Sequence, residues 1–249
     1  MNNIASSKLQ ELQKAVQAAL EVESAVNLHS FPIKVVVEGD AVLLSGEVEH
    51  IAAKRRAVLA TQAVPGVREV IDTLQLRPVE AMGMDEVMLH VRDALLGENA
   101  LCNHKLITVN RKGEQSVVHD PADAVGEIII GVEEPREVVL SGCVNSLSHR
   151  RLAELLAWWV PGSTNVRNEL RVEPAEEDND GEILDSVELA LEKDHLVDAA
   201  DVTLNCKDAV ITLSGGIPTG RQKLLAECDA WYINGVRNVV NELLPVDPA

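Results

Sequence analysis

Aromatic side chains are nearly absent from this chain of 249 residues, which holds three Trp, one Tyr and one Phe. Its cores must therefore be aliphatic, and the hydrophobic content of 46% is ample for that. No stretch approaches the ~18 consecutive apolar residues of a membrane-spanning helix, and the N-terminal stretch lacks the regions of a secretory signal. We expect a cytoplasmic protein, with peripheral attachment to a membrane as the alternative.

Metal-binding patterns are also missing. The four cysteines lie far apart without a CxxC pair, and no two of the seven histidines form HxH, HxxH or HExxH. Those spacings are the usual signature of structural and catalytic zinc sites. We therefore expect neither a metal site nor another cofactor.

Positive charge is scarce, and the formal net charge is −18. The imbalance is largest at the C-terminal end, where residues 176–249 carry five Lys and Arg against sixteen Asp and Glu. Such a field repels nucleic-acid backbones and anionic lipid surfaces. Nucleic acid is therefore not an expected partner.

Six glycines mark a phrase that the chain repeats three times. The phrase begins with "LSGEV" (44–48), "LSGCV" (140–144) and "LSGGI" (213–217). Each phrase holds the first glycine of a pair, and the second follows 20 residues later. The pairs are Gly46 with Gly66, Gly142 with Gly162, and Gly215 with Gly235. We expect the first glycine to end a strand where a side chain would obstruct the approach to the next helix. The second should close that helix in the left-handed conformation.

The same order of elements surrounds each glycine pair. An amphipathic helical segment precedes a strand-like hairpin, such as "IKVVVEGDAVLLSG" or "DVTLNCKDAVITLSG", and a second helix and a last strand follow. The predicted fold is α+β, with three tandem helix–strand–strand–helix–strand modules of about 65 residues. Each module should form a small three-stranded mixed sheet with two helices on one face. The expected boundaries are 1–79, 80–176 and 177–249, which we call copies one, two and three.

This layout, with "LSG" before the second helix and "GVREVIDTL" or "GVRNVVNEL" after it, resembles the BON domain, a small bacterial module often found in tandem. The resemblance covers nearly the whole chain. Copy two departs from it with "VPGSTNV" and with an insertion near 103–125. "NRKG" within the insertion turns an additional hairpin in one interpretation, and the whole segment is a mobile loop in the other.

Four of the five aromatic residues stand at one repeated position, the end of the second helix. They are Trp158 and Trp159 in copy two, and Trp231 and Tyr232 in copy three. Adjacent helical residues point about 100° apart, so one ring of each pair can face outward. Two interpretations stay open: both rings fill the core of the module, or the outward ring anchors a neighbouring module, another protomer or a ligand.

Basic residues gather where the second helix begins, and form a candidate patch for lipid headgroups or an acidic partner. They are Lys54, Arg55 and Arg56 in copy one, and Arg150 and Arg151 in copy two. A solvated helix face is the alternative.

The expected function is non-enzymatic. The serines of the three "LSG" phrases have no histidine at a repeated offset to activate them, and no phosphate loop or repeated acid pair is present. We expect a binding or scaffold protein with a protein partner or a homo-oligomeric state. The BON resemblance implies phospholipid binding at the envelope, a role in osmotic or other stress, or, in one type of relative, potassium binding. Phospholipid headgroups and the potassium ion are therefore alternative ligands.

Overall fold

The structure is a computed structural model that describes the backbone of residues 2–247 and the side chains of residues 8–246. The chain divides into two compact units, residues 1–77 (unit 1) and 78–249 (unit 2). Unit 1 corresponds to copy one, and unit 2 contains copies two and three. The expected boundaries of the three copies stay predictions.

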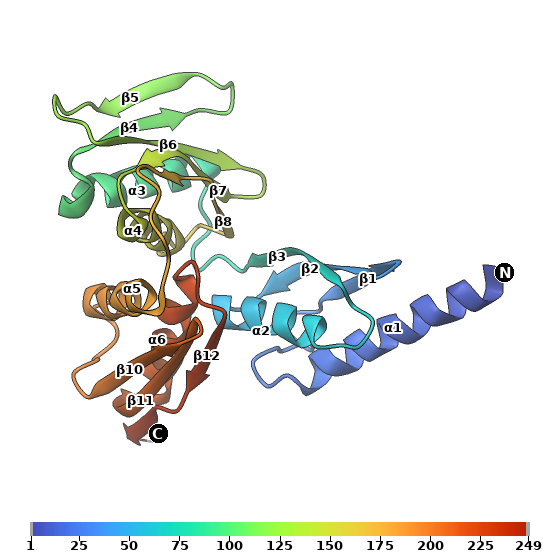
Figure 1. The fold of residues 1–249 in the computed structure, drawn as a ribbon. Coiled ribbons are helices and arrows are strands. Elements are labelled where there is room, and N and C mark those ends of the chain that lie inside the picture. The colour runs from blue at the N-terminus through green and yellow to red at the C-terminus, as the bar shows by residue number, and fades with distance from the viewer. Residues whose placement is uncertain (1, 248–249) are drawn as a thin grey trace. The chain divides into compact units, whose positions relative to one another are not determined.

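Unit 1 has two helices and three strands (Figure 1). They are α1 (Asn2–Val22), β1 (Lys34–Glu38), β2 (Ala41–Val48), α2 (Ile51–Gln62) and β3 (Glu69–Leu76). The central strand β2 is antiparallel to β1 and parallel to β3, so the sheet is mixed. Both helices lie on the same face of this sheet, because side chains that alternate along the strands, such as Val42, Leu44 and Leu74, are buried there.

Copy two repeats this plan and extends it. Its elements are α3 (Met84–Gly97), the short 3-10 helix η1 (Asn99–Leu101), β4 (His104–Val109), β5 (Gln115–His119), β6 (Gly126–Glu133), β7 (Glu137–Val144), α4 (Leu147–Trp158), β8 (Asn165–Asn168) and β9 (Arg171–Val172). The sheet order is β5-β4-β6-β7-β8, with β9 paired to β7.

The insertion is therefore a hairpin and not a mobile loop. Strands β4 and β5 pair with each other, and β4 joins the sheet parallel to β6. Asn110 fixes the turn, since its side-chain oxygen accepts the backbone N–H groups of Lys112 and Glu114 at 2.9 and 3.0 Å. Gly113 completes the turn with a φ of 78°.

Copy three has the simple plan again. Its elements are α5 (Asp180–Lys193), β10 (Val202–Lys207), β11 (Val210–Thr219), α6 (Gly220–Tyr232), β12 (Asn238–Asn241) and β13 (Leu244–Asp247). The central strand β11 pairs antiparallel with β10 and parallel with β12 and then β13. The predicted α+β class and the three tandem modules are confirmed.

The first glycine of each pair lies inside a strand and not at its end, which corrects the expected reason for it. Gly46, Gly142 and Gly215 have φ values of 135°, 111° and 109° within β2, β7 and β11. A Cβ at Gly46 would lie 2.8 Å from the carbonyl oxygen of Pro32, which leads into the antiparallel neighbour strand. At the other two positions the corresponding carbonyl lies closer still. The backbone of the preceding strand, and not the next helix, excludes a side chain here.

The second glycine of each pair serves two different purposes. Gly66 and Gly235 both have a φ of 102° after their helices, as expected. Gly162 does not have a positive φ, so the expected left-handed conformation is wrong for it. A Cβ there would lie within 2.9 Å of side-chain atoms of Met82 and Val87, so close packing against α3 requires this glycine.

Replacing Gly215 by Ala should lower the free energy of unfolding of unit 2 by about 2–4 kcal/mol, because it adds both backbone strain and a clash. Gly216→Ala is the matched control: Gly216 has no positive φ, and its new Cβ would meet its nearest neighbour at 3.6 Å. We expect the control to stay within about 1 kcal/mol of the wild type in chemical denaturation. Equal losses in the two variants would contradict this explanation of the repeated phrase.

Candidate functional site at the contact between copies two and three

Copies two and three meet through their helices. Helix α4 of copy two contacts both α5 and α6 of copy three, and the helices of unit 2 lie between its two sheets (Figure 1). The sheets cannot pair edge to edge in this arrangement. The contact therefore depends on side chains at the helix surfaces.

Three of the four candidate aromatic residues lie at this contact. The rings of Trp158 and Tyr232 stack with centroids 5.6 Å apart and planes 29° apart. Trp159 donates its indole N–H to Asp229 of α6 at 3.3 Å. Trp231, only 2% exposed, belongs to the core of copy three. Trp231 thus fills the core of its own module, whereas the rings of Trp158, Trp159 and Tyr232 meet residues of the neighbouring module.

Copy one lacks the aromatic residues of this contact. The positions equivalent to Trp158 and Trp159 are Gln62 and Ala63, and both are exposed. Since aromatic residues supply much of the energy at interfaces, the end of α2 lacks the means to form the same contact.

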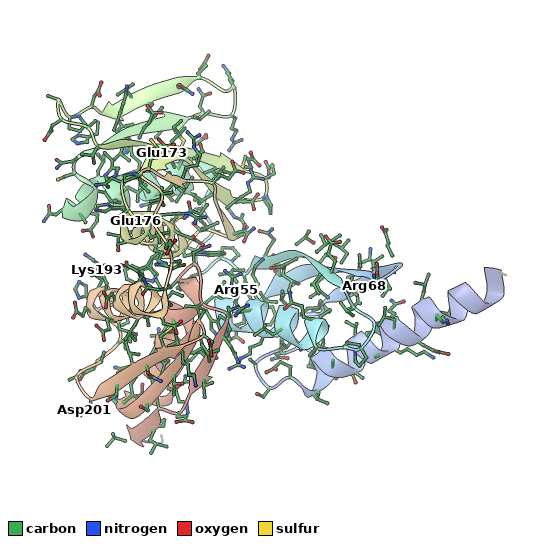
Figure 2. All side chains as sticks on the ribbon, in the orientation of Figure 1. Arg55, Arg68, Glu173, Glu176, Lys193 and Asp201 are labelled. Carbon is green, nitrogen blue, oxygen red and sulfur yellow. The ribbon has the colours of Figure 1, made fainter. Side chains whose placement is uncertain are left out.

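Two ion pairs add to the contact between copies two and three. Arg151 of α4 is 2% exposed, pairs with Asp178 at 2.6 Å and donates its Nε–H to the carbonyl of Asn234 at 2.8 Å. Lys193, which Figure 2 labels at the end of α5, pairs with Glu98 at 2.8 Å. The burial of Arg151 makes its partners essential, because an unpaired buried charge is costly.

The acidic segment between copies two and three is ordered by its own side chains. Glu176 accepts the backbone N–H of Leu147 at 2.7 Å, at the start of α4. Asn179 caps α5, and Asp180 accepts two N–H groups from the turn at 208–209, each at 2.8 Å. These bonds lower the pKa of Asp180.

Asp229 is a buried acid within the contact. It is 2% exposed, and burial, reinforced by the nearby charge of Asp194, raises its pKa to about 8. The indole N–H of Trp159 acts in the opposite direction, because it stabilises the charged form. Asp229 is therefore mainly protonated at neutral pH and serves as a polar group of the contact.

Two histidines of copy two also pack against each other. His104 is fully buried, and its ring meets that of His149 edge to face with centroids 5.0 Å apart. Burial lowers both pKa values. An unfolded histidine binds its proton below about pH 6.5, so the stability of unit 2 should fall as the pH drops through that value. His119, which flanks the insertion, instead bonds the carbonyl of Cys102 at 2.7 Å.

The five basic residues do not form one surface patch, which corrects that part of the prediction. Lys54 and Arg151 are 3% and 2% exposed and hold Asp72 and Asp178 in ion pairs. Arg55, Arg56 and Arg150 are half-buried.

Lys54 belongs to a polar cluster that all three copies share and that sequence reasoning missed. A cation of the second helix bonds a backbone carbonyl in or just after a strand that follows this helix. Lys54 bonds that of Leu74, Arg150 that of Asn168 at 3.5 Å, and Lys223 that of Leu243 at 2.7 Å. A polar residue of the last strand accepts the N–H two residues later, in Asp72, Asn168 and Asn241. The only signal in the sequence is the repeated Asp or Asn two residues before a Leu.

Among the side chains that the structure describes, no three His, Cys, Asp or Glu residues are close enough to hold a metal ion. Within the same part of the chain, no helix is both long and apolar enough to cross a membrane.

Comparison with known proteins gives a family match for each copy. The BON domain model matches residues 8–78, 115–174 and 179–244. A curated relative, osmotically-inducible protein Y of Escherichia coli (strain K12), is 30% identical over 128 residues. The match covers 49% of this chain and 64% of that relative, which is less than two thirds of its length.

Two solved structures of CdsD, a structural protein of the Type III secretion system of Chlamydia trachomatis, align over 95% of this chain. The alignments cover 98% and 94% of those chains at 13% and 14% sequence identity. The TM-scores are 0.25 and 0.23, too low to support a conclusion about this chain.

Asp229→Asn should stabilise unit 2 at pH 8 and have little effect near pH 4. Folded Asp229 keeps its proton up to about pH 8, whereas an unfolded Asp ionises near pH 4. The ionisation of Asp229 therefore favours the unfolded state increasingly as the pH rises through this window. Replacing Asp229 by Asn should raise the free energy of unfolding by on the order of 3 kcal/mol at pH 8. Thermal unfolding at both pH values measures the effect.

The control for this experiment is Asp185→Asn, which neutralises an exposed acid of α5. It should gain no more than about 1 kcal/mol at pH 8 relative to pH 4, which is the repulsion from the like-charged neighbours of Asp185 on α5. The assignment is wrong if Asp229→Asn changes the melting temperature equally at the two pH values.

Proposed function

Because the chain belongs to the BON domain family, we propose that it is a non-enzymatic binding and scaffold protein. Its two units would present separate surfaces to protein partners or to other copies of the chain. The proposal rests on the contacts of the buried ionisable groups. Lys54, Arg151 and Asp229 each bond another side chain of the protein. Buried charges paired in this way stabilise the fold, because an unpaired buried charge is costly.

The physiological setting that we propose is osmotic stress at the cell envelope. Support comes from the family and from the similarity to osmotically-inducible protein Y. The cytoplasmic location is a prediction from the sequence alone. In this role the aromatic contact holds copies two and three together as one rigid unit. Trp158, Trp159 and Tyr232 then contact each other's modules and not an external partner.

The proposal is tested by deleting the gene in its own organism and measuring growth at high osmolarity. We expect the deletion to slow growth there and the wild-type chain to restore it. Arg151→Ala should fail to restore growth, since it leaves Asp178 unpaired and loosens the contact. Arg171→Ala, which removes an exposed arginine of the same copy, should succeed. Equal growth of the parent and deletion strains at high osmolarity would contradict the proposed setting.

Phospholipid and potassium are the alternative ligands, and each has its own test. Flotation with anionic liposomes but not with neutral ones would favour a lipid-binding role through Arg55 and Arg56. A higher melting temperature in potassium than in sodium at equal ionic strength would favour a potassium site, because a ligand of the native state stabilises it. We expect no flotation, since the net charge of −18 repels anionic lipid.

A further inference from the structure

A groove of about 290 Å³ runs between α4 of copy two and α5 of copy three. Its floor is apolar: Leu152, Leu155 and Ile233 are buried, and Leu189 is half-buried. Both helices belong to unit 2, so the groove is part of one compact body.

One wall of the groove is acidic. Asp185, Glu188 and Glu192 lie three and four residues apart on α5, on one face of the helix, and all three are exposed. The described hydrogen bonds and ion pairs leave these three carboxylates without a partner. Neighbouring like charges on a helix are destabilising by about 0.2–0.5 kcal/mol per pair, so the folded chain gains nothing from this arrangement.

Among the residues that the structure describes, no cation pairs with the wall. Lys193, the basic residue of α5, is held by Glu98. Arg151 also lines the groove, but Asp178 neutralises it. One nitrogen of Arg151, Nη1, is buried without a hydrogen-bond partner in the described part of the chain. The groove thus offers an apolar floor and three negative charges.

The acidic wall is peculiar to copy three. When the buried stripes of the first helices are aligned, Asp185, Glu188 and Glu192 correspond to Leu89, Arg92 and Leu96 in α3 and to Lys14, Gln17 and Glu21 in α1. The shared framework of the module therefore does not require three acids at these positions.

We propose that this groove is the docking site for a basic amphipathic helix of a partner protein. Apolar side chains of the helix pack on the floor, and Lys or Arg side chains beside them pair with the three carboxylates. Helix α5 has 14 residues, so the matching segment is about 20 Å long. This inference rests on the proposed binding function and names the chemistry of the partner.

A second copy of the chain is a less suitable occupant. Its α3 presents Leu89 and Leu96, which are 44% and 39% exposed, on either side of Arg92. However, Arg92 is paired with Asp93, and two chains of net charge −18 repel each other. Light scattering distinguishes the two occupants: a dimer that Leu89→Ser abolishes would reassign the groove and overturn the proposal.

The direct test uses the full chain and a labelled synthetic peptide of about 14 residues, with Leu along one helical face and Lys on both sides of it. Fluorescence anisotropy should show saturable binding that weakens as salt is added. The triple variant Asp185→Asn, Glu188→Gln, Glu192→Gln should bind about tenfold more weakly, as expected for three exposed ion pairs. Leu189→Asn should also weaken binding, because it makes the floor polar.

The matched control is Glu38→Gln, Glu47→Gln, Glu69→Gln, which removes three exposed acids of unit 1 and changes the net charge equally. It should bind the peptide within about twofold of the wild type. A peptide with Glu in place of each Lys should not bind. Circular dichroism checks that all variants are folded.

Three results would overturn the proposal. One is a dissociation constant above about 1 mM for the Lys peptide. Another is an equal loss in the groove and control variants, which would mean that only the overall charge attracts the peptide. The last is full restoration of growth at high osmolarity by a groove variant that no longer binds the peptide. That last result would not contradict the proposed function, but it would show that the groove has no part in it.

Discussion

The stacking of Trp158 on Tyr232 is the contact on which the organisation of unit 2 depends. Aromatic side chains bury about 150–250 Å² each, which corresponds to several kcal/mol at about 25 cal/mol per Å². The neighbouring pair of Arg151 with Asp178 then fixes how the helices meet, because a buried arginine accepts few arrangements. Copies two and three therefore share one body, while copy one, with Gln62 at the aromatic position, forms a compact unit by itself.

All three copies share an inner framework and differ at their helix surfaces. The framework has two parts. One is the strand glycine, at which an added Cβ would clash with the backbone of the preceding strand. The other is the cation of the second helix that bonds a backbone carbonyl in or just after a following strand. Copy one places its acid on the strand, at Asp72, and has Val58 on the helix. Copies two and three have Asn on the strand and Glu154 or Glu227 on the helix. The surfaces carry the differences that matter for binding: aromatic residues at the end of α4 and α6, and acids along α5.

Much of this fold was predictable from the sequence, because the repeated glycines and alternating strands mark the same unit three times. The aromatic positions were found in the same way, as a repeated feature. Their partners were not predictable: Asp229 and Asp178 are ordinary acids in an acidic chain, and only the packing of the helices brings them to Trp159 and Arg151. The surface patch of basic residues was predicted wrongly in part for a related reason. A run of basic residues in the sequence does not show that the side chain of Lys54 is buried in its module.

Differential scanning calorimetry of the full chain tests the two-body organisation most directly. If copies two and three unfold together, two transitions should appear, with enthalpies of about 50 and 120 kcal/mol for units of this size, at about 0.7 kcal/mol per residue. The smaller belongs to unit 1 and the larger to unit 2. Three transitions of similar enthalpy would contradict the account, because they would show that the contact between copies two and three does not hold them together.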